Sequence, residues 1–173
     1  MKRILAISGS TKPNSSNWKI LDFISVAAEK HVIVELYKDL AELPYFVPGL
    51  ENDQIPPAVR LFFEKIETAD AVLFSSPEYV YSLPGILKNA LEWTVQTTVL
   101  SGKPTAFIIA ATSGEKACES LDLILETLTQ ENIPKERKIL IKSAGKYFNG
   151  DSGLNDDQLR NSLTTLIAHL LSA

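Results

Sequence analysis

The chain has 173 residues, of which 45% are hydrophobic and 22% are charged, and these values are typical of one globular domain spanning residues 1–173. The formal net charge of -4 gives no basic surface for nucleic acid, and the single cysteine, Cys118, excludes an internal disulfide and a CxxC motif. No segment approaches the ~20 apolar residues of a membrane span, and the apolar run after Arg3 is too short for a signal peptide. We therefore expect a cytoplasmic protein with no membrane partner and no nucleic-acid partner.

Short apolar runs rich in β-branched residues alternate with longer segments of helical periodicity. The runs predict five strands, at Ile4–Ser8, Val32–Leu36, Ala71–Ser75, Thr105–Ala110 and Lys138–Ile141. The periodic segments predict helices near residues 16–29, 55–69, 84–98, 115–131 and 156–171. This alternation predicts a three-layer α/β/α fold around a parallel sheet. Five such strands suit the flavodoxin-like order 2-1-3-4-5, in which ligands bind at the carboxyl ends of the strands, between the first and the third.

The segment after the first strand, GSTKPNSSN from Gly9 to Asn17, holds more hydroxyl and amide groups than a turn uses. A helix follows, so its free N–H groups and the positive end of its dipole point into this segment, which is the arrangement of a phosphate site. We predict that a phosphate group is bound by Ser10, Lys12, Ser15, Ser16 and Asn17. The alternative is a polar loop in which Ser15 or Ser16 serves only as the helix N-cap.

The loop after the third strand carries two tyrosines, Tyr79 and Tyr81, between Pro77 and Pro84. Tyrosines at the carboxyl edge of a sheet offer flat surfaces with polar tips. Taken alone, they fit packing within the loop with exposed hydroxyl groups. Because this loop faces the predicted phosphate loop, they also fit a ligand with a phosphate at one end and a flat aromatic ring at the other. Flavin mononucleotide (FMN) has that shape.

Both loops resemble those of the NADPH-dependent FMN reductase family, flavodoxin-like enzymes that include quinone, azo-dye and chromate reductases. The family pattern GSxRxxSxN has Gly9, Ser10, Ser15 and Asn17 in register, with Lys12 at the arginine position. The family pattern PEYNxSxPGxLKNAxDW has in register Pro77, Glu78, Tyr79, Ser82, Pro84, Gly85, Leu87, Lys88, Asn89, Ala90 and Trp93. The likeness continues from Phe148 to Leu171, so it spans nearly the whole chain.

The resemblance implies an FMN-dependent oxidoreductase with NADPH or NADH as reductant. In such enzymes a reduced nicotinamide passes hydride to the flavin N5 and leaves, and a quinone, azo, metal-ion or free-flavin acceptor takes its place in a ping-pong cycle. The flavin carries this chemistry, so neither a catalytic side chain nor a metal is required. The implied cofactor-binding residues are the five named above together with Pro77, Glu78, Tyr79, Val80, Tyr81, Ser113 and Gly114. The alternatives are a non-enzymatic flavodoxin-like electron carrier, an FMN-binding module, or an anion-binding domain without flavin.

Three positions depart from the family pattern. Lys12 replaces an arginine, which loses the bidentate fork but keeps the charge. Val80 replaces an asparagine, so backbone contacts to a flavin can remain there but a side-chain hydrogen bond cannot. After the fourth strand, the family's glycine-rich turn is replaced by Ser113-Gly114-Glu115-Lys116, which brings larger, charged residues close to the expected ring.

Few other residues could carry chemistry. His31 precedes the second predicted strand and His169 lies in the last predicted helix, so we expect both away from the site. Cys118 is interpreted as a packing residue of the fourth helix, although its closeness to the loop after the fourth strand leaves a redox role open.

The helix that begins near Pro84 has an apolar arc of about 200°, where covering one face of a sheet needs only about 100°. Its members are Ile86, Leu87, Ala90, Leu91, Trp93 and Val95. A deeply buried helix would explain this arc, and so would a partner on its outer side. We predict a homodimer, or a dimer of dimers, paired through this helix, as the family resemblance also implies. Leu91→Glu or Val95→Glu should then give monomers.

Overall fold

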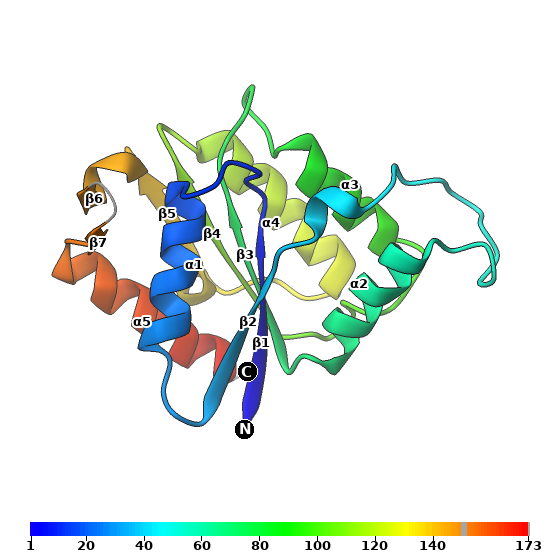
Figure 1. Cartoon of the computed structure of the whole chain (residues 1–173), viewed down its shortest axis with the longest axis horizontal. Helices are drawn as coiled ribbons and strands as arrows, with labels where there is room; N and C mark the ends of the chain where they lie inside the picture. Colours follow the sequence, from blue (N-terminus) through cyan, green and yellow to red (C-terminus); the bar gives the residue numbers. More distant parts are fainter. Residues whose placement is uncertain (150–151, 173) are drawn as a thin grey trace.

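The structure, a computed structural model, describes residues 1–149 and 152–172, and Figure 1 shows its central sheet between two layers of helices. The strands are β1 (Lys2–Ser8), β2 (Val32–Tyr37), β3 (Ala71–Ser76), β4 (Thr105–Ala111) and β5 (Lys138–Lys142). They form a parallel sheet in the order β2-β1-β3-β4-β5. The predicted order is therefore confirmed, and each predicted strand is present and extended by one or two residues.

The strand register brings the loops after β1, β3 and β4, which carry the predicted site residues, to one edge of the sheet. Ser8 at the end of β1 pairs with Ser75 of β3, and Ser75 pairs with Ile108 of β4. Because these strands run in the same direction, the loops that follow β1, β3 and β4 all leave the sheet at its carboxyl edge, the upper edge in Figure 1.

Five helices cover the two faces of the sheet: α1 (Ser16–Ala27), α2 (Pro57–Thr68), α3 (Gly85–Thr94), α4 (Glu115–Thr129) and α5 (Asp157–Leu171). Successive strand residues point to opposite faces, which is why the strand sequences are nearly continuous apolar runs. Leu5 and Phe74 pack in the core under α2, α3 and α4, whereas Ile4 and Leu73 pack in the core under α1 and α5. No helix in the described residues combines the length and the hydropathy that crossing a membrane requires.

Several details differ from the sequence predictions. Helix α3 ends at Thr94 and not near residue 98, because threonines lie at and beyond its end and β-branched residues are poor helix formers. There the Thr94 hydroxyl donates to Leu91 O at 2.8 Å, and the Thr97 hydroxyl donates to Thr94 O at 2.9 Å. The unpredicted elements are the short helices η1 (Leu40–Glu42), η2 (Lys135–Arg137) and η3 (Ala144–Tyr147) and the antiparallel pair β6 (Phe148–Asn149) and β7 (Ser152–Leu154).

Most of the wide apolar arc of α3 is buried within the chain itself. Leu91 is 2% exposed in the core shared with α2 and α4, so the expectation that this residue lies on an uncovered outer side is wrong. Residues 44–49, which we call the strap, lie against α3, and the Phe46 ring meets Trp93 edge-on with centroids 5.3 Å apart. Val95, at the end of the helix, remains 63% exposed.

Candidate functional site

The loop between β1 and α1 presents a set of free donors. Ser15 is the N-cap of α1, and its Oγ accepts a hydrogen bond from Trp18 N at 3.4 Å. The Ser10 hydroxyl accepts from Lys12 N at 3.3 Å, which shapes the loop from within. Four backbone N–H groups have no acceptor among the residues that the structure describes, namely those of Thr11, Asn14, Ser16 and Asn17. Donors of this kind at a helix N-terminus favour an anion.

Lys12 is the cation of this loop. Its side chain is exposed, and within the described part of the chain no carboxylate pairs with it. An ammonium group without an acidic partner is available to a phosphate as a charge-assisted donor. The donor set of this loop therefore fits the phosphate of FMN in both charge and chemistry, although the chain as a whole is acidic.

Two predicted site residues of this loop point inward. Asn17 is 2% exposed, its Nδ2 donates to Ala110 O at 3.1 Å, and its Oδ1 accepts from the Ser75 hydroxyl at 2.9 Å. The amide therefore joins α1 to β3 and β4, and only the backbone N–H of Asn17 is left for a ligand. Ser10 is also buried, whereas Ser15 and Ser16 are half-buried.

The loops after β1 and β3 begin in close contact. Gly9 N donates to Ser75 O at 2.8 Å. A Cβ atom on Gly9 would lie 2.9 Å from Ser76 Oγ and 3.0 Å from a Leu87 methyl carbon, so a side chain here would force these neighbours to move. Glycine at this position therefore lets the two loops start side by side, as a ligand site between the first and the third strand requires.

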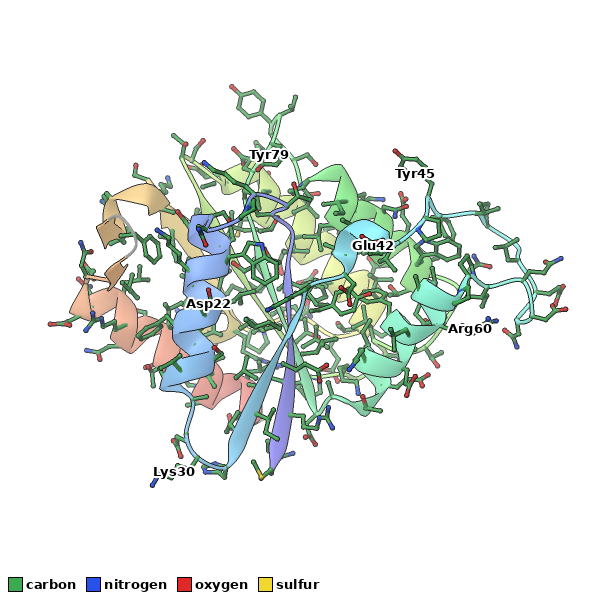
Figure 2. All side chains as sticks on the ribbon, in the orientation of Figure 1. Asp22, Lys30, Glu42, Tyr45, Arg60 and Tyr79 are labelled. Atoms are coloured by element: carbon green, nitrogen blue, oxygen red, sulfur yellow. The ribbon has the colours of Figure 1, made fainter. Side chains whose placement is uncertain are left out.

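After Pro77 and Glu78, the loop that follows β3 folds into a two-residue turn. Tyr79 N donates to Ser82 O at 2.9 Å and Ser82 N donates to Tyr79 O at 3.1 Å, with Val80 and Tyr81 at φ of +50° and +56° between them. Positive φ at both central residues is the geometry of a type I′ turn. Tyr79, Val80 and Tyr81 are 50%, 94% and 79% exposed, and Figure 2 labels Tyr79 at the carboxyl edge of the sheet.

Glu78 contacts a different helix from the one that follows it in sequence. Its Oε2 accepts a hydrogen bond from Ala117 N in the first turn of α4 at 3.0 Å, and the Ser113 hydroxyl donates to its Oε1 at 3.4 Å. A carboxylate at this position compensates the positive end of the α4 dipole. Of the two helix starts next to the loops after β1 and β4, the start of α4 is therefore occupied by Glu78, whereas the start of α1 has no such carboxylate in the described residues.

Gly114 shapes the loop after β4, and its backbone conformation and close neighbours favour glycine at this position. Gly114 has φ of +99°, and a Cβ there would lie 2.7 Å from Leu140 Cδ1 and 2.9 Å from Ile109 Cγ2. The two charged residues that follow it have partners of their own. Lys142 is hydrogen-bonded to Glu115 and lowers the pKa of that carboxyl, and Glu119 accepts a hydrogen bond from Lys116 and raises the pKa of its ammonium group.

The remaining reactive side chains lie outside these three loops. His31 precedes β2 at the amino end of the sheet, and His169 lies in α5. Burial raises the pKa of the half-buried Cys118 thiol, which disfavours the reactive thiolate. Within residues 1–149 and 152–172, no group of three His, Cys, Asp or Glu side chains could hold a metal ion.

The sequence predicted a dimer contact for the apolar residues of the second half of the long motif, residues 88–93, and gave no separate role to Asn89. In the structure, Asn89 and Trp93 do not reach the three loops and instead bind the strap. A separate apolar hollow of about 280 Å³ lies between α1 and α5, beside the start of β2 and thus at the opposite edge of the sheet. It is lined mainly by apolar residues that include Phe23, Leu163 and Ile167.

Comparison with known proteins gives consistent results. The family model described as NADPH-dependent FMN reductase matches residues 2–136. An NAD(P)H-dependent FMN reductase of Pseudomonas aeruginosa is 32% identical over 162 residues, which cover 91% of this chain and 87% of that protein. A probable NADPH:quinone oxidoreductase 2 of Oryza sativa subsp. japonica is 30% identical over 175 residues, which cover 97% and 86%.

Among solved structures, the flavoenzyme NAD(P)H:(acceptor) oxidoreductase from Paracoccus denitrificans superposes with a TM-score of 0.72. The superposition covers 99% of this chain and 96% of that one at 21% identity, and it shows a shared fold.

Proposed function

Because the chain belongs to the NADPH-dependent FMN reductase family, an oxidoreductase family whose cofactors are FMN and NAD(P)H, we propose that it passes electrons from a nicotinamide to a small-molecule acceptor. A quinone, an azo compound, a metal ion and free flavin are the acceptor classes that we consider. The names of the relatives, which include quinone and FMN reductases, support the first and the last. Membership in a family of reductases also favours an enzyme over the alternative of an electron carrier.

One observation carries the cofactor part of the proposal. At the start of α1, one short loop carries four N–H groups and the Lys12 ammonium, and none of these donors has an acceptor or acidic partner within residues 1–149 and 152–172. The FMN phosphate would bind there, held by these donors and by the half-buried Ser16 hydroxyl. Ser10 and Asn17 would contribute mainly by fixing the loop, because their side chains are buried and Asn17 is already hydrogen-bonded.

The other two loops would flank the ring. When bound, FMN supplies the redox chemistry, because its ring can take up hydride and release electrons to an acceptor. The chain's own residues would bind and orient the ring: the loop that Pro77 begins after β3 would place the Tyr79–Ser82 turn on one side of it, and Ser113 with Gly114 would lie on the other. The exposure of Tyr79, Val80 and Tyr81 leaves this edge open for the nicotinamide and the acceptor to bind in turn, which is a ping-pong cycle.

The phosphate assignment is tested by titrating the protein with FMN and following the quenching of flavin fluorescence. We expect Lys12→Ala to weaken FMN binding about 10–100-fold, since one charge-assisted contact is worth about 1.5–3 kcal/mol. Riboflavin, which lacks the phosphate, should bind poorly to the parent. Lys30→Ala is the matched control, because Lys30 is exposed at the opposite end of α1 (Figure 2). Equal affinity of the Lys12→Ala and Lys30→Ala variants would contradict the assignment, and a parent that leaves FMN fluorescence unquenched would contradict the proposed function.

The kinetic part is tested by steady-state oxidation of NADPH and NADH with a quinone and with free FMN as acceptors. A ping-pong cycle predicts parallel lines in double-reciprocal plots at several fixed acceptor concentrations. Intersecting lines would show that the nicotinamide and the acceptor bind together in a ternary complex. They would contradict the proposal that the two bind in turn at the same place.

The proposal extends to the whole chain and its surroundings. We propose that residues 1–173 act as one FMN-binding domain, since the three loops are positioned by a single sheet. A cytoplasmic location fits the use of NAD(P)H. A homodimer or a dimer of dimers remains part of the proposal and is tested below.

A further inference from the structure

The carboxylate of Glu78 joins two loops that are far apart in sequence. It accepts a hydrogen bond from the backbone N–H of Ala117, 39 residues away, at 3.0 Å, and another from the Ser113 hydroxyl at 3.4 Å. Ala117 is the third residue of α4, and the N-cap of this helix is Gly114, which has no side chain for capping. Glu78 therefore acts as the capping group that the local sequence of α4 lacks.

The turn that follows Glu78 has little else to hold it. Its two backbone hydrogen bonds join Tyr79 to Ser82 and stay within the turn. In the part of the chain that the structure describes, the side chains of its four residues make no hydrogen bond to the rest of the protein. The positive φ values of Val80 and Tyr81 make it a strained turn, and strained turns persist when their surroundings fix them. Glu78 lies at the base of the turn, where a carboxylate that is itself held in place can fix the turn.

We propose that Glu78 is a positioning residue: by capping α4 it holds the Tyr79–Ser82 turn in register with the loop after β4, so that both can flank the flavin ring. The expected effect on flavin binding rests on the proposed function, whereas the positioning of the turn by Glu78 does not. The long-motif resemblance implied direct cofactor binding by Glu78, whereas both of its carboxylate oxygens already have protein donors.

The experiment compares Glu78→Ala, Glu78→Asp and Glu78→Gln by amide hydrogen exchange of the FMN-free protein and by FMN titration. Glu78→Asp keeps the charge but is one methylene shorter, and Glu78→Gln keeps the length and one acceptor oxygen. Glu119→Ala is the matched control, because it removes a carboxylate that lies on α4 and pairs with Lys116 without reaching the turn.

We expect exchange at the amides of Ser82 and Ala117 to become about tenfold faster in Glu78→Ala and Glu78→Asp, the effect of losing one capping bond of ~1.4 kcal/mol. In the same two variants FMN should bind about tenfold more weakly and its visible circular dichroism should change. Glu78→Gln should restore most of both properties, and Glu119→Ala should match the parent. If Glu78→Ala does not fold, Glu78→Asp takes its place.

Exchange that becomes faster at Ala117 but not at Ser82 would reduce Glu78 to a helix cap and overturn the proposal. Unchanged FMN affinity and circular dichroism in Glu78→Ala or Glu78→Asp would also overturn it. A parent that binds no FMN would defeat the proposed function instead, and the exchange of Ser82 in the FMN-free variants would still decide whether Glu78 holds the turn.

Discussion

Val80 places a β-branched side chain where the backbone favours a different residue. Its φ of +50° lies in the left-handed region, which asparagine and glycine occupy far more readily than valine. The side chain is 94% exposed, so no burial offsets this strain. The family pattern has asparagine at this position, and the turn geometry gives a physical reason for it that does not involve the flavin.

We predict that Val80→Asn raises the free energy of unfolding by about 0.5–1.5 kcal/mol, because asparagine avoids most of the left-handed strain, which costs about 1–2 kcal/mol for a residue with an ordinary side chain. Urea denaturation of parent and variant measures the difference. Val26→Asn is the control, since Val26 is 85% exposed in the regular helix α1, where valine and asparagine have similar helix propensities. A Val80→Asn variant no more stable than the parent would show that the turn tolerates valine without cost.

At the scale of elements, α3 binds the strap through one line of side chains. Asn89, Trp93 and Gln96 are spaced four and three residues apart and so share one side of the helix and its following turn. Asn89 Oδ1 accepts from Phe46 N at 2.8 Å, and Trp93 Nε1 donates to Pro44 O at 2.8 Å. Gln96 Oε1 accepts from Gly49 N at 3.1 Å. All these hydrogen-bond partners on the strap are backbone atoms, and the Phe46 ring adds a side-chain contact with Trp93.

We predict that Asn89→Ala lowers the free energy of unfolding by about 1–3 kcal/mol, because it removes two hydrogen bonds worth about 0.5–1.5 kcal/mol each. The second of them runs from Asn89 Nδ2 to Pro44 O at 3.0 Å. Limited proteolysis should then cut near the strap sooner than in the parent. Lys88→Ala is the neighbouring control, since it removes only an exposed ion pair with Glu92. Equal stability of these two variants would show that the strap is not held by Asn89.

Helices on both faces of the sheet leave apolar side chains exposed. The strap and the core of the α2, α3 and α4 face bury most of the apolar arc on α3, so Leu91→Glu would disrupt the core and would not report on assembly. Exposed apolar side chains remain on this face at Val95 of the α3 end and at Leu123 of α4, which are 63% and 67% exposed. The dimer prediction therefore rests on Val95.

We predict that the parent sediments as a dimer at micromolar concentration and that Val95→Glu sediments as a monomer, because a buried unpaired carboxylate would oppose association. Val26→Glu should remain a dimer, since Val26 lies on α1 at the other face of the sheet. Analytical ultracentrifugation measures all three proteins. A monomeric parent, or a Val95→Glu variant as dimeric as the Val26→Glu control, would contradict pairing through this helix.

The sheet order could be predicted from the amino-acid sequence, because apolar runs buried on both faces and separated by helical segments admit few parallel arrangements. It also determined that Gly9 to Asn17, the loop after β3 and Ser113-Gly114 lie at one edge, because parallel strands end on the same side. The family resemblance rested on these same loops, and the comparisons confirm it.

The partners of individual side chains, in contrast, became known only from the folded chain. Asn17 points inward to Ser75 and Ala110, and Glu78 caps α4, because both find partners that are distant in the chain and that local spacing cannot reveal. The apolar arc of α3 is covered from within because the strap folds back onto it, and hydrophobic periodicity shows that a surface must be buried but not what buries it.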